Sequence, residues 1–157
     1  MIRAAIVVVS SKIVSGRESD TGRQALEQMI AGLPGTVAGY ETVPDDRKAI
    51  RDVLVMLSER HDPDLIVTIG GTGVRPTDWT PEATRDVIEK EVPGIGEAMR
   101  QASLKKVMTA MLSRGTAGIR RRTLIVNLPG SPSGAKENLA VLAPVLEHTV
   151  QKIRKEQ

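Results

Sequence analysis

Three short runs dominated by aliphatic residues constrain the fold of this 157-residue chain more than any other feature. They span residues 4–9, 65–69 and 123–128, and none shows the strict alternation of a half-exposed strand. A strand that is apolar on both faces has to be covered on both sides, as happens in parallel sheets between two layers of helices. The runs therefore predict buried parallel strands.

Segments with helical spacing of apolar residues separate these runs, which predicts alternating strands and helices. A further strand is expected over residues 36–43, and a loop over residues 10–20. The predicted helices span residues 21–31, 46–58, 81–90, 93–112 and 134–154, and Pro144 should kink or interrupt the last one. The pattern predicts the α/β class: a single three-layer α/β/α domain over residues 1–157 with a mostly parallel sheet.

Composition narrows the functional classes. The chain has no Cys, which excludes disulfides and thiolate zinc sites, and its N-terminal apolar run is too short to cross a bilayer. Its net charge is only +3, and it has no Phe, one Trp and one Tyr, which argues against a platform that stacks nucleic-acid bases. We expect a cytoplasmic protein that binds neither nucleic acid nor a membrane.

The strand at residues 65–69 runs into Gly70-Gly71-Thr72-Gly73, and a helix follows at Pro81. Glycines let backbone N–H groups approach an anion closely, and a helix N-terminus adds further donors and partial positive charge. This order favours a phosphorylated ligand, although neither a P-loop nor a complete dinucleotide fingerprint is present. The alternative is a tight structural loop with Thr80 as N-cap and Pro81 in the first helical position.

Four segments follow predicted strands, at the sheet edge where ligands bind in such folds: residues 10–20, 43–46, 70–81 and 128–132. Two of them carry carboxylates, Asp45 or Asp46 in one and Asp78 in the other. Beside a phosphate, a carboxylate is tolerated where it holds Mg²⁺, a cation that takes one or two carboxylates plus phosphate oxygens. Each acid has an alternative role: Asp45 or Asp46 as the N-cap of the helix that follows, and Asp78 as a cap of the turn before Pro81.

Taken together, these motifs resemble the molybdopterin adenylyltransferase family of the MogA/MoaB type over nearly the whole chain. The resemblance implies a molybdopterin-binding domain that transfers AMP from MgATP to the terminal phosphate of molybdopterin and releases pyrophosphate. The motifs that carry it are Val43-Pro44-Asp45-Asp46, Gly70-Gly71-Thr72-Gly73, Asp78-x-Thr80-Pro81-Glu82-Ala83, Pro93-Gly94-x-x-Glu97-x-Met99-Arg100, Ser113-Arg114 and Leu128-Pro129-Gly130-Ser131-Pro132.

Carried over by position, Asp45 and Asp78 match the two functional acids and would hold Mg²⁺. The residues expected to bind ATP and molybdopterin are Ser10, Gly70, Gly71, Thr72, Gly73, Arg75, Thr80, Pro129, Gly130 and Ser131. Ser131 is equally suited to cap the last helix, as is Ser133.

The chain departs from the family pattern in two places. Relatives commonly place Arg directly before the second acid, where this chain has Thr77, with Arg75 two positions earlier. Some place Ser after the Ser/Ala-Arg pair, where this chain has Gly115, followed by Thr116. The first difference concerns which arginine reaches the phosphates. The second concerns whether a hydroxyl acts at the position after Arg114.

The resemblance also implies a homotrimer, with pairing into hexamers left open, and handover of the product to a molybdenum insertion protein. One alternative is a molybdopterin-binding scaffold without catalysis, which turnover of ATP to pyrophosphate would discriminate. A second is a generic nucleotide- or nucleic-acid-binding module, which a steep salt dependence of DNA binding would reveal.

Overall fold

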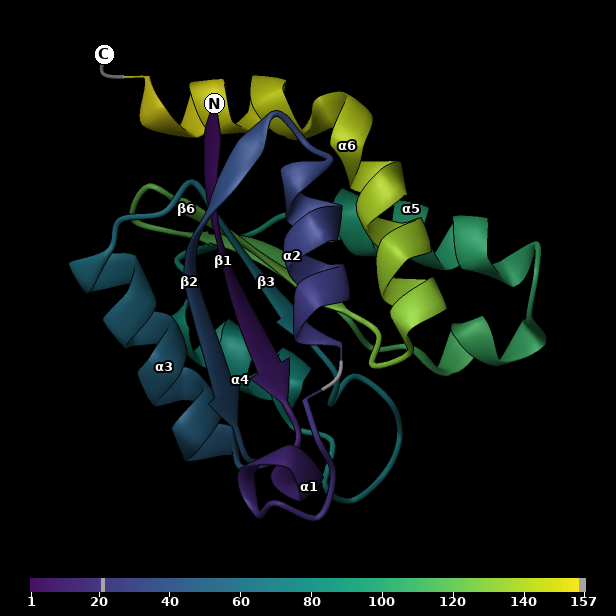
Figure 1. Cartoon of the computed structure of the whole chain (residues 1–157). Coiled ribbons are helices and arrows are strands. Elements are labelled where there is room, and N and C mark those ends of the chain that lie inside the picture. The colour runs from purple at the N-terminus through teal and green to yellow at the C-terminus, as the bar shows by residue number, and fades with distance from the viewer. Residues whose placement is uncertain (21, 156–157) are drawn as a thin grey trace.

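A computed structural model describes residues 1–20 and 22–155, and within them the chain forms a six-stranded sheet between two layers of helices (Figure 1). The sheet order is β2-β1-β3-β6-β5-β4; the first four strands are parallel, β5 runs antiparallel to β6, and β4 runs antiparallel to β5. The strands are β1 (Ile2–Val9), β2 (Gly35–Val43), β3 (Leu65–Ile69), β4 (Lys90–Glu91), β5 (Ala117–Arg120) and β6 (Thr123–Leu128). The predicted fold class is confirmed.

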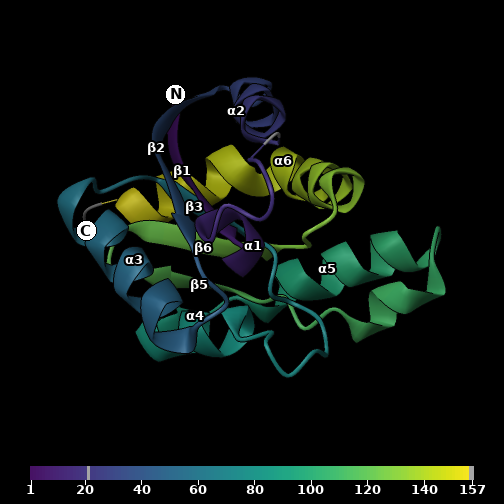
Figure 2. The same ribbon diagram turned by 60° about the horizontal axis from the view of Figure 1, so that its bottom comes forward.

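Alternate residues of the central strands point to opposite faces and build two separate cores. Ala4 and Ile6 belong to the core beneath α2, α5 and α6, whereas Ala5 and Val7 belong to the core beneath α3 and α4. Figure 2 shows the two helix layers on either side of the sheet. The helices of the first layer are α2 (Arg23–Ala31), α5 (Pro93–Leu104) and α6 (Pro132–Arg154); those of the second are α3 (Arg47–Arg60) and α4 (Thr80–Val87).

The strand order reverses between β1 and β3. The chain leaves β1 for β2 on one side and then crosses, through α3 on the opposite face, to β3 on the other side of β1. Such a reversal opens a crevice at the carboxyl ends of the two strands, because the following loops diverge to opposite faces. The loops after β1 and β3 begin at Ser10 and Gly70, so two predicted site segments meet at this point.

Several predicted boundaries were wrong. The predicted loop after β1 contains a four-residue helix, α1 (Ser11–Val14), because Ser10 caps it: the Ile13 N–H donates to Ser10 Oγ at 3.3 Å. The helix predicted to Lys90 ends at Val87, because Lys90 and Glu91 pair with β5. The first predicted residue of α2, Thr21, lies outside the described residues.

The helix predicted over residues 93–112 is two elements, α5 and the 3₁₀ helix η1 (Met108–Leu112), which together project from the body of the molecule (Figures 1 and 2). The last helix, α6, starts at Pro132 rather than Gly134 and continues through Pro144 without interruption. Figure 1 shows that α6 bends along its course, as expected for an internal proline.

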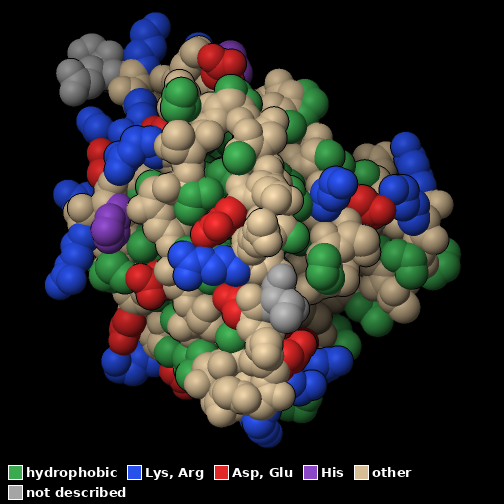
Figure 3. Space-filling model, viewed as in Figure 1, with side chains coloured by type: hydrophobic (Ala, Val, Ile, Leu, Met, Phe, Trp, Pro, Cys, Tyr) green, Lys and Arg blue, Asp and Glu red, His purple; other side chains and the backbone are tan. Residues whose placement is uncertain are grey.

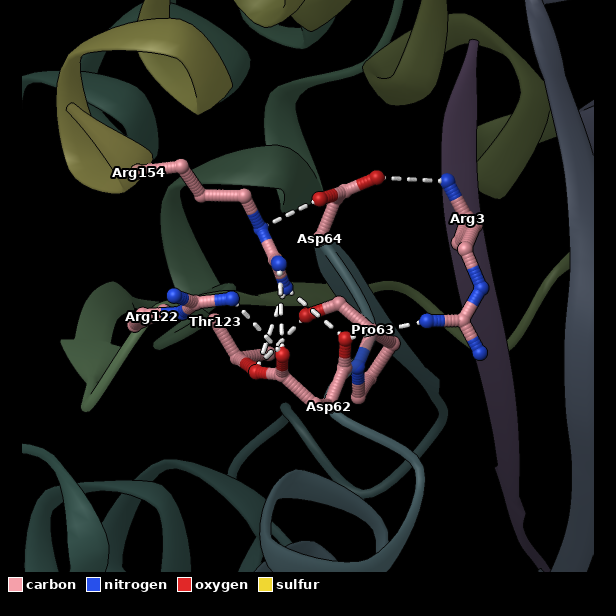
Figure 4. Close-up of polar contacts among 7 residues, drawn as sticks. All are labelled: Arg3, Asp62, Pro63, Asp64, Arg122, Thr123 and Arg154. Atoms are coloured by element: carbon pink, nitrogen blue, oxygen red, sulfur yellow. Dashed lines mark hydrogen bonds and ion pairs between the residues drawn. The ribbon is translucent and has the colours of Figure 1, made fainter.

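A polar cluster fastens the end of α6 to the amino ends of the strands, opposite the crevice (Figure 4). Arg154 donates to the Asp62 carbonyl oxygen at 2.8 Å and forms an ion pair with Asp64, which also accepts the Arg3 N–H at 2.8 Å. Burial alone would raise the pKa of Asp62, but hydrogen bonds and charge from Arg154 and Arg122 lower it. The cluster therefore has a structural role.

None of the helices in the described ranges combines the length and the apolarity of a transmembrane span.

Candidate active site

The loop after β3 requires glycine at its first two positions. Gly70 and Gly71 have φ angles of +100° and +70°, a region that side chains with a Cβ rarely adopt. A Cβ on Gly70 would lie 2.8 Å from the Val9 carbonyl oxygen, and one on Gly71 would overlap the Thr80 hydroxyl. The chain turns sharply here, and only glycine fits at both positions because a Cβ would clash with the neighbouring backbone or side chain.

Thr80 closes this turn and does not cap α4. Its hydroxyl donates to the Gly70 carbonyl at 2.9 Å, and its N–H donates to the Gly71 carbonyl at 3.1 Å. The N-cap of α4 is Trp79, which makes no side-chain capping bond. The alternative of Thr80 as N-cap is therefore wrong: its hydroxyl is buried against the glycine loop.

The N–H groups of Gly71, Thr72 and Gly73 donate to no protein acceptor in the described part of the chain. Consecutive free N–H groups in a tight turn form a concave donor set that suits a phosphate. The helix terminus contributes less than expected, because the Thr80 N–H is already used and Pro81 has none. The glycine loop, rather than the helix terminus, therefore offers most of the free N–H donors that could bind an anion.

Asp78 folds back onto the glycine loop. One of its carboxylate oxygens accepts the Arg75 N–H at 2.9 Å, and a Cβ on Gly73 would come within 2.9 Å of the same oxygen. Asp78 thus closes the loop and caps no helix. The Arg75 side chain is exposed and makes no hydrogen bond or ion pair in the described part of the chain, so it is free to contact an anionic ligand.

The two acids after β2 have different roles. Asp46 caps α3, since its carboxylate accepts the Ala49 N–H at 2.8 Å. Asp45 instead pairs with Ser11: the Ser11 N–H donates to its carboxylate at 3.0 Å, and its own N–H donates to Ser11 Oγ at 2.8 Å. The pair ties the loop after β1 to the loop after β2 and leaves Asp45 half-buried at the carboxyl edge.

A cation–π contact brings the two acid-bearing loops together. The Arg47 guanidinium, two residues after Asp45, lies 5.9 Å from the ring centroid of Trp79, the residue after Asp78. Arg47 also donates two 2.8 Å hydrogen bonds to Asp86, and these lower the pKa of Asp86. The side chain of Trp79 is 39% exposed beside this pair.

A cavity of about 450 Å³ adjoins the glycine loop and lies between α5, η1 and the start of α6. Of the predicted residues, Thr72, Gly73, Pro129 and Ser131 line it; Asp45 and Asp78 do not. Gly73 joins the two parts of the site, because it lines the cavity and contacts Asp78. Polar side chains that were not among the predicted site residues also line it, among them Arg100, Ser103, Lys106, Ser113, Glu137 and Asn138.

The remaining predicted residues lie around this cavity. Ser131 lines it and also caps α6 by accepting the Gly134 N–H at 3.2 Å, so both roles foreseen for it are compatible. Gly130 is exposed and faces Gly70, with 3.4 Å between its would-be Cβ and the Gly70 Cα. Ser10 caps α1 next to this edge.

Gly115 and Thr116, which stand where some relatives have a serine, both make structural contacts. The Gly115 carbonyl accepts a 2.8 Å hydrogen bond from Arg100, and a Cβ on Gly115 would lie 3.2 Å from the Asn127 carbonyl oxygen. The Thr116 hydroxyl is turned away and donates to Glu91 at 2.8 Å. Neither residue offers a hydroxyl to the cavity.

Comparison with known proteins assigns the family. Residues 5–148 match the model described as a probable molybdopterin binding domain. The chain belongs to this molybdopterin-binding domain family. The resemblance on which the sequence prediction was based is therefore confirmed.

Similar members of the family include named enzymes and solved structures. The chain is 39% identical to a molybdopterin adenylyltransferase of Helicobacter pylori, over 97% of this chain and 88% of that protein. It is 41% identical to the protein of that name in Escherichia coli, over 88% of this chain and 72% of that one. The crystal structure of the molybdopterin biosynthesis enzyme MoaB from Thermus thermophilus superposes with a TM-score of 0.91 and 49% identity, covering 98% of this chain and 96% of that one.

Proposed function

We propose that this protein is a molybdopterin adenylyltransferase of molybdenum cofactor biosynthesis, acting through residues 1–157 as one unit. It transfers AMP from ATP to molybdopterin: an oxygen of the molybdopterin terminal phosphate attacks the α-phosphorus, and the bond to the β-phosphate breaks to release pyrophosphate. The relatives that bear this name, about 40% identical over most of the chain, support the activity. The position of the glycine loop, between the cavity and Asp78, carries the proposal.

This reaction depends on positioning and on charge neutralisation more than on a protein nucleophile. The free N–H groups of residues 71–73 and the side chain of Arg75 would receive phosphate oxygens. The cavity lined by Thr72, Gly73, Pro129 and Ser131 would hold the pterin and its phosphate. Ser10, Gly130 and Thr80 shape the surrounding edge.

The two acids fit Mg²⁺. Asp45 and Asp78 each use only Oδ2 in hydrogen bonds to protein, and their Oδ1 atoms have no protein donor in the described part of the chain. Hard carboxylate oxygens in small number, completed by phosphate oxygens, are the ligands that Mg²⁺ prefers. When bound, the ion would neutralise charge on the triphosphate. Asp45 and Asp78 are the residues that would hold it.

The decisive experiment compares three Asp→Asn variants in an assay of pyrophosphate release with MgATP and molybdopterin. We expect Asp78→Asn and Asp45→Asn to lose about 100-fold or more in rate, of the order seen when one stabilising polar group is removed. Folding and molybdopterin affinity should stay near normal. Asp46→Asn is the matched control: it removes the neighbouring charge but keeps the cap, because Asn caps helices as well as Asp.

An active Asp78→Asn protein would contradict the metal role. A wild-type protein that binds molybdopterin but never releases pyrophosphate would instead support the scaffold alternative.

We also propose self-association as a trimer. The projecting segment of α5 and η1 exposes large apolar side chains, among them Val107, Met108 and Met111, each more than half exposed. Figure 3 shows hydrophobic side chains along this part of the surface. Contiguous exposed apolar surface marks interaction sites. Light scattering should give three times the 16.9 kDa chain mass, or six times for a paired assembly, and Met108→Lys should shift it toward the monomer.

Handover of adenylylated molybdopterin to a molybdenum insertion protein, and a cytoplasmic location, stay predictions from the sequence.

A further inference from the structure

The segment from Ser113 to Gly115 lies between the two parts of the candidate site. On one side Arg100, which lines the cavity, holds it by donating to the Gly115 carbonyl at 2.8 Å and to the Ser113 carbonyl at 3.4 Å. The fit is tight: a Cβ on Gly96 of α5 would lie 2.9 Å from the Gly115 carbonyl oxygen. The segment is therefore fixed to the cavity wall.

On its other side, a single side chain of this segment reaches two points of the loop that carries Asp78 and one point of the helix that follows it. The Nε of Arg114 donates to the Gly73 carbonyl at 2.7 Å, and its Nη2 donates to the Asp78 carbonyl at 2.9 Å. Its Nη1 forms an ion pair with Glu82 in the first turn of α4. The Arg114 N–H donates to the Thr72 carbonyl at 2.8 Å.

The loop has few other attachments. In the described part of the chain, every other hydrogen bond made by residues 73–78 is internal, between Arg75 and Asp78. Thr80 fixes the ends of the turn, at Gly70 and Gly71, but nothing beyond them. The position of Asp78 relative to the cavity thus depends on Arg114.

We propose that Arg114 is a positioning residue for adenylyl transfer, a role that rests on the proposed function. It holds the phosphate-binding N–H groups and the carboxylate of Asp78 at a fixed place relative to the cavity. A planar guanidinium suits this task, because its donors diverge in a rigid fork and can reach two carbonyls and a carboxylate at once. A Lys ammonium is a single point charge and cannot span the three acceptors.

Arg114 also neutralises Glu82. Without it, the Glu82 carboxylate would stand unpaired in the first turn of α4, close to the site for anionic substrates, and one of its oxygens, Oε2, is already buried without a hydrogen-bond partner. Loss of Arg114 would therefore both loosen the loop and expose the phosphates to an uncompensated negative charge.

The test uses the full-length protein and compares Arg114→Met and Arg114→Lys with wild type. A displacement of about 1 Å at a reacting group costs about 100-fold in rate, so we expect kcat to fall about 100-fold in Arg114→Met. The Kd for molybdopterin should change less than threefold, because Arg114 is not part of the cavity lining. Arg114→Lys should stay below one tenth of wild-type kcat.

Arg120 provides a matched control. It also makes three side-chain bonds to other elements, to Ser58 Oγ at 3.1 Å, the Val87 carbonyl at 2.9 Å and Glu59 at 2.8 Å, but at the opposite end of α4. Arg120→Met should lower the midpoint of thermal unfolding at least as much as Arg114→Met does, and leave kcat within twofold of wild type.

A second readout is independent of turnover. Hydrogen exchange of the Arg75 N–H, which donates to Asp78, should accelerate in Arg114→Met and remain unchanged in Arg120→Met.

Three results would overturn the role. The first is wild-type kcat in a folded Arg114→Met protein. The second is an equal loss of molybdopterin binding and kcat, which would make Arg114 a purely structural residue. The third is protected exchange at Arg75 in that variant. Failure of the wild-type protein itself to form adenylylated molybdopterin would instead refute the proposed function, and the role of Arg114 with it.

Discussion

The buried side chain of Asn127 should contribute several kilocalories per mole to stability, because its amide hydrogen-bonds to three residues outside β6. Asn127 is 1% exposed in β6. Its Nδ2 donates to Thr68 Oγ1 of β3 at 3.0 Å and to Thr84 Oγ1 of α4 at 2.9 Å, and its Oδ1 accepts the Thr116 N–H at 3.1 Å. Asn127→Leu keeps nearly the same shape and removes all three hydrogen bonds.

The magnitude follows from the groups left behind. The Thr116 N–H, on a residue only 4% exposed, would be stranded at a cost of about 1–3 kcal/mol. Each threonine Oγ1 would lose the N–H donor that it accepts from, which adds about 1 kcal/mol per hydroxyl. We therefore expect Asn127→Leu to lower the free energy of unfolding by about 3–5 kcal/mol, a large share of a stability of about 5–15 kcal/mol.

Equilibrium urea unfolding at one fixed protein concentration measures this loss, since concentration matters for an oligomer. The triple variant Asn127→Leu, Thr68→Val, Thr84→Val removes the orphaned hydroxyls together with their partner. It should recover about 2 kcal/mol, because the two hydroxyls are removed together with the amide that donated to them, while the Thr116 N–H stays unpaired. The reasoning would be refuted if Asn127→Leu cost less than about 1 kcal/mol, or if the triple variant were less stable than the single one.

Three further predictions concern acid stability, the glycine turn and the nucleotide. The pKa of Asp62 is lower in the folded protein than in the unfolded chain, where it is about 4. Asp62 therefore stabilises the fold at pH values above the unfolded pKa, and this contribution is lost as the pH falls through the folded pKa. Asp62→Asn should weaken the protein at pH 6 and flatten the loss of stability toward pH 3 in urea titrations. Gly71→Ala, whose methyl group would overlap the Thr80 hydroxyl at φ +70°, should cost about 2–3 kcal/mol, whereas Gly94→Ala, which faces open space, should cost nothing measurable by the same assay. MgATP should change the emission of Trp79, the one tryptophan, and an unchanged spectrum at saturating ATP would place the nucleotide away from Asp78.

Sequence reasoning succeeded where a single physical pattern decides the structure. The strands at 65–69 and 123–128 were predicted with the observed bounds, because a short run dominated by aliphatic residues between polar turns has one favourable environment in a chain of this size. The missed strands are those without such a pattern. β4 has two residues, both exposed, and β5 has four residues including Gly118, so their pairing depends on tertiary context.

The sequence predicted which loops form the candidate site, but not which contacts their residues make. Strand ends located the loops at Ser10, Asp45, Gly70 and Ser131, but spacing could not decide which of two adjacent acids caps α3. The structure separates them, because only Asp46 accepts the Ala49 N–H. Arg100 and Arg114 lay within the quoted motifs, yet their partners are 13 to 41 residues away in the chain, beyond the reach of local pattern.

The arrangement also accounts for acidic residues beside a loop that we propose to bind an anion. Negative charge from Asp78 and Glu82 flanks the free N–H groups of residues 71–73, and the terminus of α4 supplies little compensation, since the Thr80 N–H is used and Pro81 has none. Arg114 pairs with Glu82, whereas the Asp78 carboxylate accepts only a neutral backbone N–H. The charge of Glu82 is therefore neutralised by the protein, whereas the negative charge of Asp78 is not. A divalent cation carried by the nucleotide would be attracted to that remaining charge, and we therefore expect Asp78, and not Glu82, to act on the triphosphate.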